Sequence, residues 1–316
     1  MPPKTLSQLA HLRKALDSRE VRRKGSRVND LIANQAAMSY WIGQQLLVDR
    51  STPSSDDPLT SRACRESDCG SEFVAWLRRI HRPLVMSRKA WEHVAITRAV
   101  EAAGLLHEGS RGLGFGVGRE PLVADFASRG VQLVATDLSI EDPRAGAWAA
   151  TGQHALSVDS LRDSRICPDE VLTANTQVRA VDMNRIPGDL RDFDFVWSSC
   201  AFEHLGTLEA GLAFVEHSME CLKPGGLAVH TTEFNLSSNS GTVTEGQTVI
   251  YRQHDMDDLH HRMKSQGHDM SPFTVGPPAG LFDHIIDIPP YHDGGLVVRL
   301  DDFLVTSAVV IVRKAE

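Results

Sequence analysis

The sequence predicts an α/β protein with a doubly wound, mostly parallel sheet. From residue 110 onward, short apolar runs alternate with segments whose apolar residues recur at helical spacing. Such an alternation of strand and helix is typical of a parallel sheet covered by helices on both faces. A glycine-rich stretch, RGLGFGVG at 111–118, stands at its start, where the first strand-to-helix turn is expected.

Length and composition fit a soluble globular protein. The chain has 316 residues, 41% of them hydrophobic, enough for one elaborated domain or for two. The net charge of -8 makes a nucleic-acid partner unfavourable, because a phosphate backbone would be repelled. Five scattered cysteines fit neither a disulfide framework nor a zinc site. No apolar run has the length of a signal peptide or a membrane span, so we expect no membrane partner and a cytoplasmic location.

Residues 1–108 are expected to form a helical extension or lid over the site. Residues 1–50 carry apolar side chains at helical spacing, which suit either a homodimer contact or packing on the rest of the chain. Residues 51–70 are rich in Ser, Pro, Asp and Gly, and this composition predicts a surface loop. A further helix is expected over roughly 88–106, ending before Gly109.

Residues 109–316 are expected to form the sheet domain. The predicted strands lie at 131–137, 178–183, 193–199, 226–234 and 303–314. The segment 208–222 has apolar residues at spacings of three and four and predicts a helix. An insertion near 236–302 is less regular, and in it we expect a helix at 255–263 and a short strand at 285–288.

The glycine stretch predicts a ligand that the backbone approaches closely. Gly114, Phe115, Gly116 and Gly118 are placed for the first turn, where missing side chains make room and amide N–H groups face the ligand. The dinucleotide fingerprint G-x-G-x-x-G is not present. It needs a glycine three residues after its second glycine, but Val117 stands three residues after Gly114 and Arg119 three residues after Gly116. A nucleoside-type ligand without a pyrophosphate is therefore favoured.

An acidic residue follows at the position where ribose hydroxyls are bound. Asp137, with Leu138 after it, ends the next predicted strand about 20 residues on, as such a site requires. The strict alternation G-x-G-x-G resembles the first motif of class I S-adenosylmethionine-dependent methyltransferases, and Asp137 looks like the acid of the second.

Three later segments continue that resemblance in the family's order over residues 110–235. VDMNRIP is similar to the third motif, in which Asp182 and Met183 would frame the adenine. FDFVWSSCAFEHL, which contains Ser198, is similar to the fourth, and CLKPGGLAVHTT to the turn that feeds the fifth strand. The resemblance implies a seven-stranded Rossmann-like methyltransferase sheet, S-adenosylmethionine as cofactor, and methyl transfer. The segment pattern is similar to bacterial methyltransferases of secondary metabolism and surface polysaccharides, which implies a small-molecule or glycan-like acceptor.

One position departs from the family pattern. The family usually has an acid two residues before the first glycine of the triplet, and here that residue is Gly112. Glu120, just past the loop, and Glu92, on the preceding helix, are the alternatives for binding the methionine amino group. Trp91, on the same helix, is expected to pack near the cofactor.

Catalytic groups are expected on the loops after the fourth and fifth strands. His204 and His230 are the leading candidates for a general base, because imidazole titrates near neutral pH. Glu203 and Glu233 are candidates for orienting a histidine or binding substrate. Oxygen methylation is the first expectation and nitrogen methylation the second. By residue type, His230 and Glu233 with His204 could also form a metal site. No metal is expected, however, because metal-assisted methyl transfer in the family usually draws on carboxylates at these loop positions, and the fourth strand here ends in Trp-Ser-Ser without an acid.

The insertion is expected to supply substrate recognition. Its polar and aromatic candidates are Tyr251, Arg252, His254, Tyr291 and His292. Two other functions are kept open. One is a binding or regulatory protein that holds the cofactor without turnover, and the other is a nicotinamide-dependent oxidoreductase, which the glycine spacing disfavours.

Overall fold

The computed structural model describes residues 56–146, 153–155, 157–278, 280–289, 291 and 295–316. The strands of this part are β1 (Arg62–Ala63), β2 (Arg111–Phe115), β3 (Gln132–Asp137), β4 (Thr176–Ala180), β5 (Phe193–Ser199), β6 (Leu222–Asn235), β7 (Asp269–Met270), β8 (Ile286–Asp287), β9 (Val297–Leu300) and β10 (Phe303–Arg313). The α-helices are α3 (Ser71–Arg79), α4 (Arg88–Ala102), α5 (Leu122–Ser128), α7 (Asp169–Asn175), α8 (Leu208–Ser218) and α9 (Gln253–Ser265). Short 3-10 turns include η4 (Phe202–His204) and η5 (Met219–Cys221).

The strands form one mixed sheet. Its order is β4-β3-β2-β5-β6-β10-β9-β8, with β1 and β7 also paired to β10. β4, β3, β2, β5 and β6 are parallel, and β10 runs antiparallel to β6. The predicted doubly wound, mostly parallel sheet is therefore confirmed. The antiparallel direction of β10 was not predicted, because an apolar run has the same pattern in both directions.

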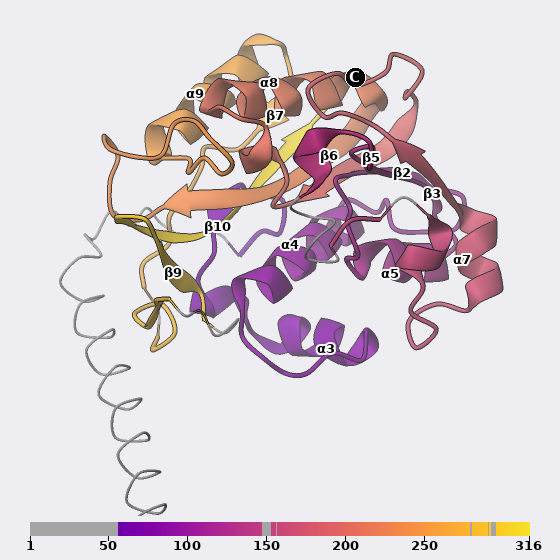
Figure 1. Ribbon diagram of the computed structural model, residues 1–316, viewed down its shortest axis with the longest axis horizontal. Helices are drawn as coiled ribbons and strands as arrows, with labels where there is room; N and C mark the ends of the chain where they lie inside the picture. Colours follow the sequence, from indigo (N-terminus) through magenta and orange to yellow (C-terminus); the bar gives the residue numbers. More distant parts are fainter. Residues whose placement is uncertain (1–55, 147–152, 156, 279, 290, 292–294) are drawn as a thin grey trace, which may run out of the picture.

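Helices cover both faces of the sheet. α8 and α9 lie on one face, and α3, α4 and α5 lie on the other (Figure 1). Side chains that alternate along a strand enter opposite layers. On β5, Val196 packs in the layer of α8, whereas Phe195 and Trp197 pack in the layer of α4 and α5. Full burial of such a side chain stabilises the fold by about 1.5–3 kcal/mol.

The segment before α3 corrects the expected surface loop. β1 pairs with β10, and residues 60–65 are buried. The backbone N–H of Cys64 donates to the carbonyl of Ser307, and the Ser61 hydroxyl accepts from the N–H of Ile311. Because these backbone and side-chain groups are satisfied by the sheet, a polar stretch that looks like a linker is buried without penalty.

The remaining boundaries differ by a few residues from the expected ones. α4 begins at Arg88 after the cap Ser87, whose hydroxyl accepts from the N–H of Ala90, and ends at Ala102. α8 ends at Ser218, and η5 continues the expected helix in tighter form. α9 and β8 match the helix and the short strand expected in the insertion. The expected helices and dimer contact of residues 1–50 lie outside the described residues.

Gly114 has a packing role under the glycine loop. A Cβ on this residue would overlap the Trp197 ring and the Val117 side chain, whereas at Gly241 the nearest atom would be 3.7 Å away. We expect Gly114→Ala to lower the free energy of unfolding by about 1–3 kcal/mol, the usual effect of overpacking. Gly241→Ala should leave it within about 0.5 kcal/mol. Urea unfolding of both variants measures the difference, and equal stabilities would contradict this assignment.

Candidate active site

A cavity of about 890 Å³ opens at the carboxyl ends of the parallel strands. It is lined by the residues that follow β2, β3, β4 and β5, and by the first turns of α4. It lies at the topological switch point of the sheet, where β2 has β3 as its neighbour on one side and β5 on the other. Ligands of open α/β sheets bind at this point, because the strand ends there leave a crevice.

The glycine loop forms one wall of the cavity. Gly116 and Gly118 line it and adopt positive φ angles of 57° and 50°. A Cβ on Gly116 would lie 3.0 Å from Cβ of Ala201, and one on Gly118 would lie 2.6 Å from the carbonyl oxygen of Gln153. Gly114 and Phe115, which were expected to contact the cofactor, belong to β2 and do not line the cavity. Glycine is thus required at the two loop positions both by backbone conformation and by space.

Asp137 stands at the end of β3 and faces the cavity together with Leu138. Its carboxylate accepts hydrogen bonds from the backbone N–H groups of Leu138, at 2.8 Å, and of Ala155, at 3.1 Å. Burial raises the pKa of Asp137, although these backbone N–H groups act in the opposite direction. The acid is therefore fixed in position by the loops around it, with lone pairs left for a hydroxyl-bearing ligand.

Asp182 and Met183 line the cavity next to this acid. Asp182 accepts from the guanidinium of Arg144 at 2.8 Å and from the backbone N–H of Asn184 at 3.0 Å. Met183 is buried and supplies an apolar surface beside it. The structure thus brings together Gly116, Gly118, Asp137 and this pair, as the sequence motifs predict.

Glu120 lies in the cavity beside the glycine loop. Its carboxylate accepts from the indole N–H of Trp197 at 2.7 Å, and its second oxygen is 3.8 Å from Nε2 of His93. Burial raises the pKa of Glu120 to about 8, and burial lowers the pKa of His93 to about 3. The His93 Nε2 atom is buried and has no hydrogen-bond partner within the described residues. This corner therefore holds two neutral polar groups near pH 7.

Glu92 does not line the cavity. It is buried in α4, where it is paired with Lys89 at 2.7 Å and accepts from the hydroxyls of Ser199 and Ser307. Burial acts to raise the pKa of Glu92, but the charges of Lys89 and Arg88 outweigh it and lower the pKa to about 2. Because both of its oxygens already accept hydrogen bonds and it does not line the cavity, Glu92 is the weaker of the two alternatives for a ligand ammonium.

The first turn of α4 carries cations where the helix dipole favours anions. Arg88 is paired with Glu233 of β6, and Lys89 with Glu92. Lys89 also lines the cavity, where its side chain is 56% exposed. The opposing carboxylates explain why two cations are tolerated at this helix start, and they place a charged network at the cavity floor.

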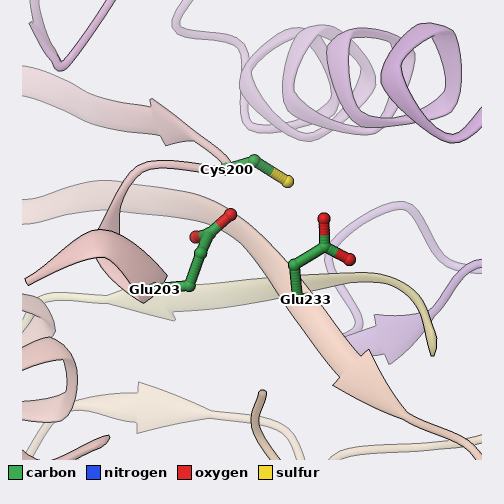
Figure 2. Close-up of side chains that lie close together, drawn as sticks. All are labelled: Cys200, Glu203 and Glu233. Atoms are coloured by element: carbon green, nitrogen blue, oxygen red, sulfur yellow. The ribbon is translucent and has the colours of Figure 1, made fainter. Parts of the chain in front are cut away.

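Cys200, Glu203 and Glu233 meet at this floor, although they come from the end of β5, from η4 and from β6 (Figure 2). Their ligand atoms all lie within 4.8 Å of one another. The Glu203 carboxylate is almost fully buried and accepts from the Thr232 hydroxyl at 3.0 Å. Burial raises the pKa of Glu203, and burial followed by the charge of Glu203 raises that of the Cys200 thiol.

His204 lines the cavity next to this cluster. Its Nδ1 lies 2.8 Å from the carbonyl oxygen of Gln247, which can only accept a hydrogen bond, so Nδ1 carries the proton. In the neutral ring Nε2 is then the basic nitrogen, and it lies 3.9 Å from Oε1 of Glu203. The hydrogen bond to Gln247 thus fixes the tautomer that a general base needs.

His230 does not fit the expected role of base. Its ring is fully buried between the hydroxyls of Ser198, at 2.9 Å, and Ser218, at 3.1 Å, and burial lowers its pKa to about 3. It packs against Phe202 and Phe214 and does not line the cavity. Its strand position points the ring into the α8 layer, so it is a hydrogen-bonded core residue.

Two expected cofactor contacts are also placed elsewhere. Trp91 is buried, and its indole N–H donates to Asp68 at 3.0 Å under the guanidinium of Arg62. Ser198 is occupied by His230, while its neighbour Ser199 lines the cavity. Neither Trp91 nor Ser198 is among the cavity-lining residues. Sequence spacing alone could not tell which face of the helix or strand the cavity would take.

The insertion does not contribute the expected recognition residues to the cavity. Tyr251 is buried against Phe202, Arg252 caps α9 with Asp255, His254 bonds to the carbonyl of Asn239 on the surface, and Tyr291 bonds to that of Arg299. None of these four lines the cavity. His292 lies outside the described residues. Instead, the cavity is closed by α3 and the segment that follows it, which supply the apolar side chains of Trp76, Leu77, Ile80, Pro83 and Val85.

Comparison with known proteins leaves the family open. No family model matches the chain, and no curated protein does. Solved structures that resemble it include a 1,6-didemethyltoxoflavin-N1-methyltransferase of Burkholderia thailandensis with bound 1,6-didemethyltoxoflavin and S-adenosylhomocysteine (14% identity, 68% of this chain and 77% of that chain, TM-score 0.36). Another is a SAM dependent methyltransferase from Aquifex aeolicus (15% identity, 68% of this chain and 88% of that chain, TM-score 0.35). A third is the [4+2]-cyclase SpnF (14% identity, 81% of this chain and 99% of that chain, TM-score 0.41). Likenesses this distant assign no function, which has to be argued from the site.

Proposed function

We propose that the chain transfers a methyl group from S-adenosylmethionine to a hydroxyl or amine of a small-molecule or glycan-like acceptor. One observation carries the proposal. A single cavity at the switch point of the sheet is lined by Gly116, Gly118, Asp137, Asp182 and Met183, the residues of three motifs that follow one another in the sequence. Its volume of about 890 Å³ is at the upper end of ligand sites, which suits a cofactor together with an acceptor.

The residues present fit this cofactor. Asp137 is placed to accept from ribose hydroxyls, and Asp182 with Met183 to bind a base by hydrogen bonding and apolar contact. Glu120, with the unpartnered Nε2 of His93 beside it, takes the place of the missing acid at Gly112 as the binding group for an amino acid end. The antiparallel β10 beside β6 further disfavours the nicotinamide rival, whose fold continues with a parallel strand.

The chemistry asks little of the protein beyond alignment and proton removal. S-adenosylmethionine supplies an already activated methyl group. The chain supplies His204, whose Nε2 is set by the Gln247 carbonyl to accept the proton of an acceptor hydroxyl or ammonium. Lys89 and the apolar wall of α3 are the groups that position an acceptor. The proton passes from His204 to solvent after transfer.

The pKa of Glu120 gives a test of whether this residue binds the ammonium group of the cofactor. An ammonium binds the carboxylate form, and below pH 8 this form is the minor one because burial raises the pKa of Glu120 to about 8. We expect S-adenosylhomocysteine affinity to rise about tenfold per pH unit between pH 6 and 7 and to level off near pH 8. Calorimetry in buffers of different ionisation enthalpy should find close to one proton released on binding at pH 7.

Glu120→Gln is the matched variant, since it keeps the shape and the acceptor oxygen for Trp197. Its affinity should not depend on pH over this window, and its binding should release no proton. A wild-type affinity that is also independent of pH would remove Glu120 from the ammonium site and leave the rest of the proposal standing.

Turnover separates an enzyme from a binding or regulatory protein. The purified chain is incubated with S-adenosylmethionine labelled in its methyl group and a panel of hydroxyl and amine acceptors. Formation of S-adenosylhomocysteine together with an acceptor heavier by one labelled methyl group supports the enzyme. Tight cofactor binding without any methylated product over a broad panel favours the regulatory alternative.

Location and oligomeric state stay predictions. All five cysteines lie among the described residues as free thiols, in keeping with the expected reducing cytoplasm. No helix in the described part of the chain has the length and apolar character needed to cross a membrane.

A further inference from the structure

The floor of the cavity carries three side chains with metal-ligand chemistry. Cys200, Glu203 and Glu233, named here the thiol-carboxylate triad, have ligand atoms within 4.8 Å of one another and all line the cavity. Figure 2 shows the Cys200 sulfur and the Glu203 carboxylate directed toward the space above Glu233. Cys200 and Glu203 are brought together by the short turn between β5 and η4, whereas Glu233 comes from the neighbouring strand β6.

A buried oxygen of this triad has no hydrogen-bond partner. Glu203 is 1% exposed, and its Oε1 makes no hydrogen bond among the described residues. Nε2 of His204 lies 3.9 Å from this oxygen, beyond hydrogen-bond distance. An unsatisfied buried carboxylate oxygen is costly, so natural proteins pair such groups or use them to coordinate a cation. A carboxylate oxygen of Glu203 lies within 4.8 Å of the ligand atoms of the other two members of the triad.

Each carboxylate of the triad is already held by its other oxygen. Oε2 of Glu203 accepts from the Thr232 hydroxyl, and Oε2 of Glu233 is paired with Arg88. Metal-binding carboxylates are commonly oriented in this way by donors that do not touch the metal. The arrangement leaves Oε1 of both residues for a ligand.

Cys200 is held in a strained backbone conformation. Its φ is 45°, in the left-handed region that disfavours residues with a Cβ by about 1–2 kcal/mol. Its backbone N–H donates to the carbonyl and hydroxyl of Thr231, which fixes this conformation. Such strain is found at functional sites, where it directs a side chain. Here it directs the thiol toward the two carboxylates (Figure 2).

We propose that the thiol-carboxylate triad binds one divalent cation of the zinc class. A thiolate selects zinc-class ions over magnesium or calcium. The bonds would be about 2.3 Å to sulfur and about 2.0–2.2 Å to oxygen, so the ligand atoms draw together on binding. The Cys200 S–H bond breaks, a metal–sulfur bond forms, and the proton goes to solvent. Three protein ligands leave a fourth position toward the cavity, the pattern of catalytic sites.

The charges around the triad agree with this occupant. Lys89 is paired with Glu92, and Arg88 with Glu233, so within the described part of the chain no cation lies at hydrogen-bond distance from the Glu203 carboxylate. A dication that binds Glu203 and the Cys200 thiolate adds two charges opposite to two, and the floor becomes neutral. The sequence did not indicate this site, because Glu203 lies four residues past the end of β5 and Glu233 lies on the neighbouring strand β6.

Cobalt(II) is the probe, because its bond to a thiolate gives an intense near-ultraviolet absorption. The full chain is stripped with a chelator, dialysed and titrated with CoCl₂, without cofactor, so that the outcome is independent of the proposed methyl transfer. We expect one equivalent to bind with the thiolate band, and zinc to displace it. In Cys200→Ala the band should be absent and the affinity at least about 100-fold lower, a larger loss than for an outer-shell group.

Two further variants keep the test decisive. Cys69→Ala removes another half-buried free thiol, outside the cavity, and should bind cobalt as the wild type does. Thr232→Val leaves all three ligands but removes the hydrogen bond to Glu203, and we expect an affinity about tenfold lower with the band retained. Circular dichroism of each variant verifies its fold. No thiolate band in the wild type, or a band that survives in Cys200→Ala, overturns the proposal.

Discussion

Gly116→Val is expected to abolish cofactor binding. Gly116 has φ 57° and lines the cavity, and a Cβ there would already lie 3.0 Å from Ala201 and 3.4 Å from the Met183 sulfur. A β-branched side chain would fill the space between the glycine loop and the side chains of Ala201 and Met183, and it would shift the backbone of the loop. We expect the affinity for S-adenosylhomocysteine to fall by at least about 100-fold, or about 2.7 kcal/mol. Isothermal titration calorimetry measures it.

Gly104→Val is the matched control for this loss. Gly104 also has a positive φ, 71°, but a Cβ there meets nothing within 4 Å, and the residue does not line the cavity. Both variants carry the same backbone strain, which lowers stability by about 1–2 kcal/mol. Only Gly116→Val should lose binding. If the two variants bind the cofactor equally well, the glycine loop is a packing turn and the cofactor site lies elsewhere.

His204→Ala is expected to reduce turnover by about 100- to 10,000-fold, the usual contribution of a general base. The effect should fall on kcat, with cofactor affinity within about twofold of wild type, since the ring is assigned to the acceptor proton and not to the cofactor. Methyl-transfer rates on the acceptor found by screening measure kcat, and calorimetry measures the affinity.

His254→Ala is the control for His204→Ala. His254 also bonds through Nδ1 to a loop carbonyl, at 2.8 Å, but it lies on the surface away from the cavity. It should keep wild-type kcat. Full turnover in His204→Ala would rule out a histidine base, because His230 is buried in the core. Catalysis would then rest on alignment, or on Glu203 as the base, since Glu203 also lines the cavity.

The sequence predicted the sheet because its signals are local. The run 193–199 became β5 with the expected bounds, and the glycine turn, Asp137 and Asp182 came to one edge because parallel strands place their carboxyl ends together. The strands β1, β2, β7 and β9 were missed, β2 because its glycines were assigned to the turn that follows it. Two-residue strands such as β1 and β7 have no periodicity, and β1 pairs with a part of β10 that lies more than 200 residues further along the chain.

The site was only partly predictable for a related reason. Which way a side chain points depends on the face that its strand or helix turns to the cavity, and this placed His204 at the cavity and His230 in the core. The α3–α4 segment supplies His93, Lys89 and Trp76, none of which belongs to a motif. The cation pair at the start of α4 was a signal that could have been read, since it conflicts with the helix dipole.

The central claim is that this cavity binds S-adenosylmethionine. Its most direct test is calorimetric titration of the purified chain with S-adenosylmethionine and S-adenosylhomocysteine at pH 8, where about half of Glu120 is ionised, with NAD as the control ligand. We expect saturable binding of one equivalent of each sulfur compound and no saturable binding of NAD. No binding of either sulfur compound, or preferential binding of NAD, would contradict it.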